Sequence, residues 1–254
     1  MTRENLDLTP APDVKIPEAT TPDRQTLEWH EGDMPYSQEF GDHFYCREDG
    51  RLECGHVFLQ GNGLPQRWQH AANFRIGELG FGTGLNFCET WRQWKETRVG
   101  DAELHFVSFE RFPMRADDIG RALSRWPEIE AERLALCAQW PQQPGGRIDL
   151  DFPGGMRLTV VCGIAFEEIA RFDSLFDAWY LDGFAPRRNP DMWSQELMRL
   201  VCEKTVDGGT FATYAAAGFV RRNLQDAGFS VQRNPGFGSK REMLCGMKTA
   251  SRNG

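Results

Sequence analysis

The 254-residue sequence has no long apolar run and no segment typical of secretion. No stretch approaches the ~20 consecutive apolar residues that a membrane-spanning helix needs. Residues 1–33 carry several acids and no apolar core segment, which is unlike a signal peptide. We therefore expect a cytoplasmic protein without a membrane-spanning helix.

Cysteine and histidine are few and scattered. The seven cysteines form no C-x-x-C pair, and the five histidines never fall at metal-ligand spacing beside them. Four cysteines lie in apolar stretches and are typical of small buried side chains in a reducing compartment. These four are Cys88, Cys162, Cys202 and Cys245. The pattern predicts neither a disulfide framework nor a metal site.

Positive charge is scarce overall, but it is unevenly distributed. The net charge of −8 argues against a generic nucleic-acid binder. Residues 1–60 contain thirteen acids and five bases, whereas residues 218–254 contain seven bases and two acids. Two interpretations fit a basic end on an acidic protein: a limited contact with a polyanion, or an ordinary solvated surface.

Three segments differ in pattern along the chain. Residues 1–26, rich in Pro, Thr and Asp, resemble a disordered leader. Residues 27–70 have a short, β-like pattern, and Asp49-Gly50 predicts a hairpin turn between Phe44-Tyr45 and Val57–Leu59. We therefore expect a small N-terminal β-rich extension, followed by a main domain over residues 71–248.

The main domain alternates strand and helix patterns, which is typical of an α/β fold with a mostly parallel sheet. The predicted strands are 74–79, 104–109, 157–162 (after a hairpin through Pro153), 176–181, 210–214, 229–233 and 242–247. The predicted helices are 85–95, 115–125, 129–139, 166–171, 190–204 and 219–227. The last two strands are joined by a short connection, so the final strand is expected to be antiparallel.

A glycine-rich turn, Gly80-Phe81-Gly82-Thr83-Gly84, connects the first predicted strand of the main domain to its helix. Closely spaced glycines let the backbone approach a ligand, and the helix N-terminus presents free N–H groups to it. The G-x-G-x-G spacing is one residue tighter than the dinucleotide fingerprint. Glu78, just before the turn, would repel a pyrophosphate but suits a cationic ligand such as S-adenosylmethionine (SAM). The alternative is a tight strand–helix connection without a ligand.

Two further acids stand at predicted strand ends, where open α/β sheets bind ligands. Glu110 has the two acceptor oxygens that grip ribose hydroxyls; otherwise it is an exposed strand-end acid. Asp182 precedes Gly183 and Phe184, so a carboxylate enters the cleft beside a ring that can stack. A carboxylate at that point can organise the proton of an amine that accepts a methyl group. The alternative is an Asx-type turn with Phe184 and Trp193 in a small cluster.

The segment Gly236–Met243 combines an aromatic residue with two adjacent cations, Lys240 and Arg241. That composition suits contact with a phosphate backbone and stacking on a base. A surface hairpin with no ligand explains it equally well.

Five ordered motifs together closely resemble one family. They are GFGTGLNF (80–87), FERFP (109–113), DAWYLDGFAPRRNPDMWS (177–194), GGTFATYAAAGFVRRNLQDAGF (208–229) and GFGSKREMLCG (236–246). The family is the methyltransferase part of the tRNA 5-methylaminomethyl-2-thiouridine biosynthesis bifunctional protein. The likeness begins near Leu27, includes SQEFGDHFYCREDG (37–50) and VFLQGN (57–62), and runs to about Met247.

The resemblance implies a class I SAM-dependent methyltransferase fold, Rossmann-like, with a seven-stranded, mostly parallel sheet. It also implies methylation of the 5-aminomethyl group of a wobble uridine in tRNA. The catalytic candidates are Asp182 and Phe184, and the cofactor-binding candidates are Glu78, Gly80, Gly82, Thr83, Gly84, Asn86, Glu110, Gly163 and again Asp182. Substrate-binding candidates, facing the anticodon stem-loop, are Pro186, Arg187, Arg188, Arg221, Arg222, Lys240 and Arg241.

Two departures from the family pattern are visible. The family often shows Gly-Asp after the third strand, where this chain has Gly163-Ile164. Adenine contact there is expected from the backbone at Gly163 or from Glu167, one turn later. The family's FAD-dependent oxidase half is absent from these 254 residues, so the resemblance implies either a stand-alone methyltransferase or one part of a longer protein. In the longer protein, an oxidase domain or partner would act in the preceding step.

Two rival functions remain at this point. An NAD-dependent oxidoreductase is weakened by the G-x-G-x-G spacing and by the lack of an obvious hydride-transfer His or Tyr. A SAM-binding regulatory module without catalysis is weakened by the intact segment Asp182–Pro186.

Overall fold

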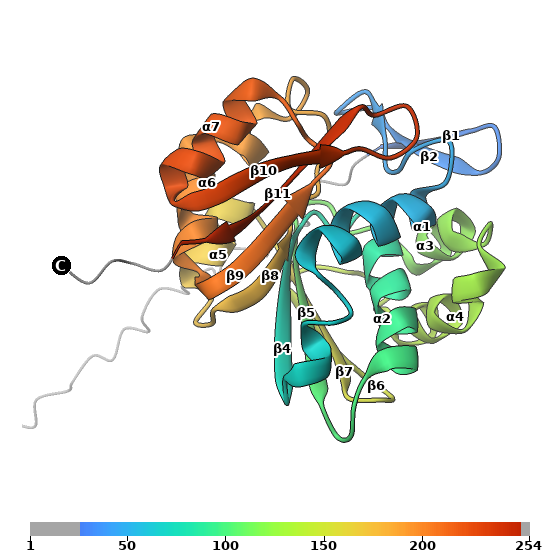
Figure 1. Ribbon diagram of the computed structural model, residues 1–254. Coiled ribbons are helices and arrows are strands. Elements are labelled where there is room, and N and C mark those ends of the chain that lie inside the picture. Colours follow the sequence, from blue (N-terminus) through green and yellow to red (C-terminus); the bar gives the residue numbers. More distant parts are fainter. Residues whose placement is uncertain (1–25, 250–254) are drawn as a thin grey trace, which may run out of the picture.

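The computed structural model describes residues 26–249, and these form a mixed eight-stranded sheet covered by helices on both faces (Figure 1). The strand order is β10-β11-β9-β8-β4-β5-β7-β6. Five central strands run parallel: β9 (Thr205–Thr213), β8 (Phe176–Tyr180), β4 (Asn73–Leu79), β5 (Glu103–Glu110) and β7 (Met156–Cys162). The α/β fold class is confirmed.

Antiparallel strands close both edges of this sheet. β11 (Glu242–Lys248) pairs with β9 on one side and with β10 (Phe229–Pro235) on the other. The predicted antiparallel final strand is therefore confirmed. At the opposite edge, β6 (Arg147–Phe152) forms a hairpin with β7. This first arm of the expected hairpin brings the total to eight strands, one more than the seven predicted.

Two hydrophobic clusters lie on the two faces of the sheet, because alternate strand residues point to opposite sides. One face is covered by α2 (Leu85–Thr97), α3 (Ala116–Leu123) and α4 (Glu130–Gln139), the last preceded by the short η4 (Pro127–Ile129). The other is covered by α5 (Ala165–Arg171), α6 (Gln195–Glu203) and α7 (Gly218–Ala227). Figure 1 shows these two helix groups on opposite sides of the strands.

The helix predicted over residues 190–204 is divided into two parts. The first turn, η5 (Pro190–Trp193), is a 3-10 helix, and α6 begins after Ser194. The Ser194 hydroxyl accepts a hydrogen bond from the backbone N–H of Leu197, which caps the new helix. The hydroxyl explains why the helix restarts there.

The N-terminal extension is only partly as predicted. Three short antiparallel strands form a separate sheet: β1 (Leu27–His30), β2 (Met34–Ser37) and β3 (Asp42–His43). The chain then becomes helical through α1 (Gly50–Glu53), the π-helix η1 (Cys54–Leu59) and the 3-10 helix η2 (Gln60–Asn62). A further 3-10 turn, η3 (Trp68–His70), precedes β4.

The predicted hairpin at Asp49-Gly50 is wrong, because Asp49 caps a helix. Its carboxylate accepts hydrogen bonds from the backbone N–H groups of Arg51 and Leu52, and from the indole of Trp126 at 2.9 Å. Phe58 then stacks on Tyr180 at 5.2 Å between ring centroids. The helical segment therefore covers the sheet, where two strands of a hairpin were expected.

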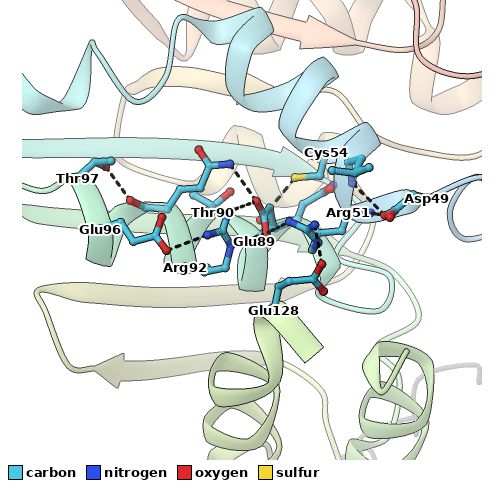
Figure 2. Close-up of polar contacts among 12 residues, drawn as sticks. Asp49, Arg51, Cys54, Glu89, Thr90, Arg92, Glu96, Thr97 and Glu128 are labelled. Carbon is cyan, nitrogen blue, oxygen red and sulfur yellow. Dashed lines mark hydrogen bonds and ion pairs between the residues drawn. The ribbon is translucent and has the colours of Figure 1, made fainter. Parts of the chain in front are cut away.

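An ion-pair network joins this extension to α2 (Figure 2). Glu89 is 1% exposed and accepts hydrogen bonds from Arg92 on its own helix. Arg51 of α1 lies 3.5 Å from Glu89 and 2.9 Å from Glu128. A buried carboxylate needs such partners, since an unpaired one would be strongly destabilising. The network fixes α1 beside the first turns of α2, where the glycine-rich turn ends.

Within residues 26–249, no helix combines the length and apolarity that crossing a membrane requires. The same residues contain no group of three or more His, Cys, Asp or Glu side chains placed to hold a metal ion.

Candidate functional site

A cavity of about 470 Å³ opens at the carboxyl ends of the parallel strands. Its walls come from the extension, the glycine-rich turn and the start of α2, the ends of β5, β8 and β9, and the loop between β10 and β11. Of the predicted site residues, it is lined by Gly80, Gly82, Thr83, Asn86, Glu110, Asp182, Phe184 and Lys240. The cavity lies where β4 and β8 are neighbours although β5 follows β4 in the chain, which is the switch point that favours ligand binding.

The three glycines of the turn all have positive φ, at +86° for Gly80, +53° for Gly82 and +76° for Gly84. Residues other than glycine rarely adopt this region of backbone conformation. A Cβ at Gly80 would meet nothing closer than 3.7 Å, whereas one at Gly82 would lie 3.2 Å from the Phe44 ring. The turn therefore offers bare backbone to the cavity along one wall.

Asn86 holds two acids together at the start of α2. Its side-chain nitrogen donates to Glu78 at 2.9 Å and to Asp182 at 2.7 Å. Glu78 is 1% exposed and does not line the cavity, and its side chain interacts with Ser108 as well as with Asn86. Burial raises the pKa of Glu78 well above its usual value. Adjacent parallel strands thus bring two carboxylates to one amide.

Asp182 follows β8 and faces the cavity. Its other oxygen accepts the backbone N–H of Gly183 at 2.7 Å. Burial raises the pKa of Asp182 to about 7, although the hydrogen bonds from Asn86 and Gly183 act in the opposite direction. A carboxylate with such a pKa can both accept and release a proton at neutral pH.

Glu110, at the end of β5, supports the glycine-rich turn directly. Its carboxylate accepts the backbone N–H of Gly82 at 2.9 Å and that of Phe112 at 2.7 Å. Burial raises the pKa of Glu110, while these backbone donors lower it. Each oxygen has a second lone pair. Glu110 can therefore shape the turn and still accept hydrogen bonds from a ligand.

Aromatic side chains of the extension form a wall that was not predicted from the sequence. Phe184 stacks on Phe40 at 4.5 Å and meets Phe44 edge-on at 5.1 Å. Both rings line the cavity, as do Tyr45 and Glu53. One segment could have indicated this wall: SQEFGDHFYCREDG (37–50) is dense in aromatic and acidic residues and lacks the alternation of a strand.

The predicted substrate-binding cations lie at the same edge of the sheet. Arg187 and Arg188 belong to the loop after β8, and Arg188 lies 3.5 Å from Asp42. Arg221 and Arg222 are in the first turns of α7, which follows the carboxyl end of β9. Arg187, Arg188, Arg222 and Arg241 are exposed, whereas Arg221, Pro186 and Lys240 are half-buried.

Two positions considered for adenine lie outside the cavity. Gly163 follows β7, and its N–H donates to the backbone oxygen of Glu110. Glu167 is exposed and pairs with Arg171 at 3.4 Å. Neither residue lines the cavity.

Comparison with known proteins gives a consistent result. Residues 127–249 match a family described as S-adenosyl-L-methionine-dependent methyltransferase. This matched range includes Asp182 and begins after the glycine-rich turn. Among solved structures, MnmC2 from Aquifex aeolicus is similar in fold, with a TM-score of 0.70 and 20% identity, over 89% of this chain and 72% of that one.

Curated relatives are more similar in sequence. The tRNA 5-methylaminomethyl-2-thiouridine biosynthesis bifunctional protein MnmC of Chromohalobacter salexigens is 44% identical over 93% of this chain. The protein of the same name from Methylobacillus flagellatus is 46% identical over 88% of this chain. In both cases the chain spans only 35% of the relative's length. These matches support an S-adenosyl-L-methionine-dependent methyltransferase, and most of this chain is similar to part of the tRNA 5-methylaminomethyl-2-thiouridine biosynthesis bifunctional protein MnmC.

Proposed function

We propose that this chain transfers the methyl group of SAM to the primary amine of 5-aminomethyl-(2-thio)uridine at the wobble position of tRNA. The observation that carries the proposal is the position of Asp182. Its carboxylate faces the same cavity as the glycine-rich turn and is tied to the start of α2 by Asn86. The product chemistry is taken from the name shared by the curated relatives.

The residues around the turn fit SAM. This cofactor carries an ammonium and a sulfonium, and the cavity offers the carboxyl groups of Glu110 and Asp182 close to the bare backbone of the turn. Glu110 is suited to the ribose hydroxyls, because each of its oxygens keeps a lone pair after binding the backbone. A pyrophosphate would meet these negative charges unfavourably, which also counts against the NAD-dependent alternative.

When bound, SAM supplies an electrophilic methyl group on sulfur. The amine attacks with its lone pair, so a nitrogen–carbon bond forms, the sulfur–carbon bond breaks, and one proton must leave the nitrogen. In our proposal Asp182 accepts that proton and passes it to water, a role that its pKa of about 7 permits. Asn86 fixes the carboxylate orientation, since its amide is itself held by Glu78.

The aromatic wall also has a role in the proposed reaction. Phe184 is held by Phe40 and Phe44, so its ring is oriented before any substrate arrives. We assign it to packing on the flat uridine ring, which excludes water from the reacting amine. Preorganised positioning of this kind accounts for much of the rate in group transfer.

The cationic rim is proposed to bind the anticodon stem-loop. Arg187, Arg188, Arg222 and Arg241 are exposed at the carboxyl edge of the sheet, and the loops that carry Arg187, Arg188 and Arg241 also border the cavity. Wobble bases in a single-stranded loop can be turned outward, which is how most sequence-specific RNA recognition occurs. The rim would hold the phosphates while one base enters the cavity. An oxidase acting in the preceding step is the partner that the proposal implies.

One assay tests the proposal. The protein is incubated with SAM carrying a labelled methyl group and with tRNA from cells that lack this modification, and the tRNA is then digested to nucleosides. We expect label in 5-methylaminomethyl-(2-thio)uridine. Binding of SAM without any transfer to tRNA would instead support the regulatory module, and binding of NAD in preference to SAM would support the oxidoreductase.

A further inference from the structure

Lys240 points into the cavity, where it is bound to an acid of the extension. Its Nζ lies 2.6 Å from Glu53 Oε1, and it also lies over the Tyr214 ring, 3.6 Å from the centroid. The side chain of Glu53 is only 7% exposed and that of Lys240 34%. Glu53 and Lys240 are 187 positions apart in the sequence, so only the fold brings them together. A cation over a ring and beside a buried carboxylate is held in a defined place.

This pair is connected to the proposed catalytic carboxylate. The Tyr214 hydroxyl donates a hydrogen bond to the backbone oxygen of Gly183, the residue after Asp182. Glu53, Lys240, Tyr214 and Asp182 all line the same cavity. Because Glu53 is buried beside this cavity, a charge at the pair acts on Asp182 with less screening than it would have at the surface.

Charged and titratable groups face Asp182 from every element packed around it. Glu53 and Cys54 come from α1 and η1, Glu78 from β4, Tyr214 from the end of β9, and Lys240 from the β10–β11 loop. Glu53 raises the pKa of Asp182, and Lys240 lowers it. The two effects have opposite signs, as expected for an ion pair that presents little net charge to a third group.

We propose that Lys240 is a positioning residue for the proposed methyl transfer, because it neutralises Glu53 and so leaves Asp182 as the carboxylate that receives the amine proton. The inference rests on the proposed function. Without Lys240, the buried Glu53 would attract the substrate ammonium away from Asp182 and would favour the protonated form of Asp182. With Lys240 in place, the cavity keeps one carboxylate available at the end of β8.

The test compares Lys240→Met, Glu53→Gln and the double variant. The pKa of Asp182 is measured in the free protein by ¹³C NMR of labelled aspartate carboxyls, with Asp182→Asn to assign the signal. We expect Lys240→Met to raise this pKa by about 1 unit, Glu53→Gln to lower it, and the double variant to return close to the wild-type value. Lys240→Arg keeps the charge and is expected to stay near wild type. Lys248→Met, which removes a lysine at the other end of β11, is the matched control and should change nothing.

The rate of tRNA methylation gives the second readout. A rise of about 1 unit from a pKa near 7 would lower the rate at pH 7 roughly fivefold and shift the rising limb of the pH–rate profile to higher pH. The double variant should recover most of that decrease. An unchanged Asp182 pKa, or a double variant at least as impaired as Lys240→Met, would overturn the inference and make the pair a structural clasp. If wild-type protein methylates no tRNA, the proposed function fails, while the NMR titration still decides the role of the pair.

Discussion

The side-chain nitrogen of Asn86 lies 2.7 Å from Asp182 Oδ2. This hydrogen bond joins the first turn of α2, which follows the glycine-rich turn, to the end of β8, from which the carboxylate enters the cavity. Because the same nitrogen also donates to Glu78, both hydrogens of the amide are committed to carboxylates. The cofactor-binding turn and the proposed catalytic acid therefore form one connected unit.

Asn86→Ala should remove the hydrogen bond that joins the first turn of α2 to Asp182. Asp182 would lose a hydrogen bond that favours its ionised form, so its pKa should rise and turnover at neutral pH should fall by roughly tenfold. Two carboxylates would also face each other without the intervening donor. Turnover at saturating tRNA and SAM, measured across pH, checks this. If the pH–rate profile keeps its shape and position, Asn86 has only a structural role at the start of α2.

Gly82→Ala should weaken SAM binding by tenfold or more. The new Cβ would lie 3.2 Å from the Phe44 ring and would displace the aromatic wall. The backbone at φ +53° would also be strained by about 1 kcal/mol. Gly100→Ala is the matched control, since Gly100 has φ +59° and no atom within 4 Å of the new Cβ. Gly82→Ala should lose at least as much stability as Gly100→Ala in thermal unfolding, but only Gly82→Ala should lose SAM affinity in calorimetry. Equal affinities for the two would remove the turn from the cofactor site.

Glu110→Ala should also reduce SAM affinity by at least tenfold. Each charge-assisted hydrogen bond to a ribose hydroxyl is worth about 1.5–3 kcal/mol, and the turn would lose the acceptor that holds the Gly82 N–H. Glu167→Ala, which removes an exposed acid outside the cavity, should leave the affinity unchanged. A decrease below about twofold for Glu110→Ala would return that residue to the role of a backbone clamp. A clear decrease for Glu167→Ala would instead place adenine near α5.

The exposed cations should act on tRNA and not on SAM. Arg187→Ala combined with Arg222→Ala should weaken tRNA binding by roughly tenfold at low salt, and the slope of log K against log salt should fall by about one for each phosphate that is no longer neutralised. Arg98→Ala with Arg157→Ala, at the amino-end edge of the parallel strands, is the matched control. If tRNA binding is insensitive to salt, or if the control pair has an equal effect, the exposed cations do not bind the tRNA phosphates as proposed.

Much of the fold was predictable because the period of the hydrophobic pattern changes clearly between strands and helices. β4 and α2 lie within two residues of the predicted limits, and the glycines between them are visible as a turn. The extension was predicted less well. Asp49-Gly50 fits a hairpin turn as well as a helix cap, and only the distant Trp126 and the sheet beneath Phe58 decide between them.

The place of Asp182 and Glu110 beside the cavity was predictable, because Asp182 follows a strand and Glu110 ends one. The site was not predictable where its walls come from loops far apart in sequence. The composition of the segment Gly236–Met243 predicted that Lys240 contacts the tRNA backbone, and that contact stays a prediction. The structure additionally gives it a partner, Glu53, which no local pattern could reveal. The aromatic wall from Phe40 and Phe44 depends in the same way on how the extension folds over the sheet.

The central claim is that Asp182 receives the proton of the attacking amine, and Asp182→Asn tests it most directly. The change keeps the size of the side chain and removes its charge and its ability to accept a proton. Turnover is measured at saturating tRNA, with SAM affinity determined in parallel. We predict that turnover falls by roughly 10²-fold or more while SAM affinity stays nearly unchanged. A rate within a few-fold of the wild type would contradict the claim and reduce Asp182 to a turn residue.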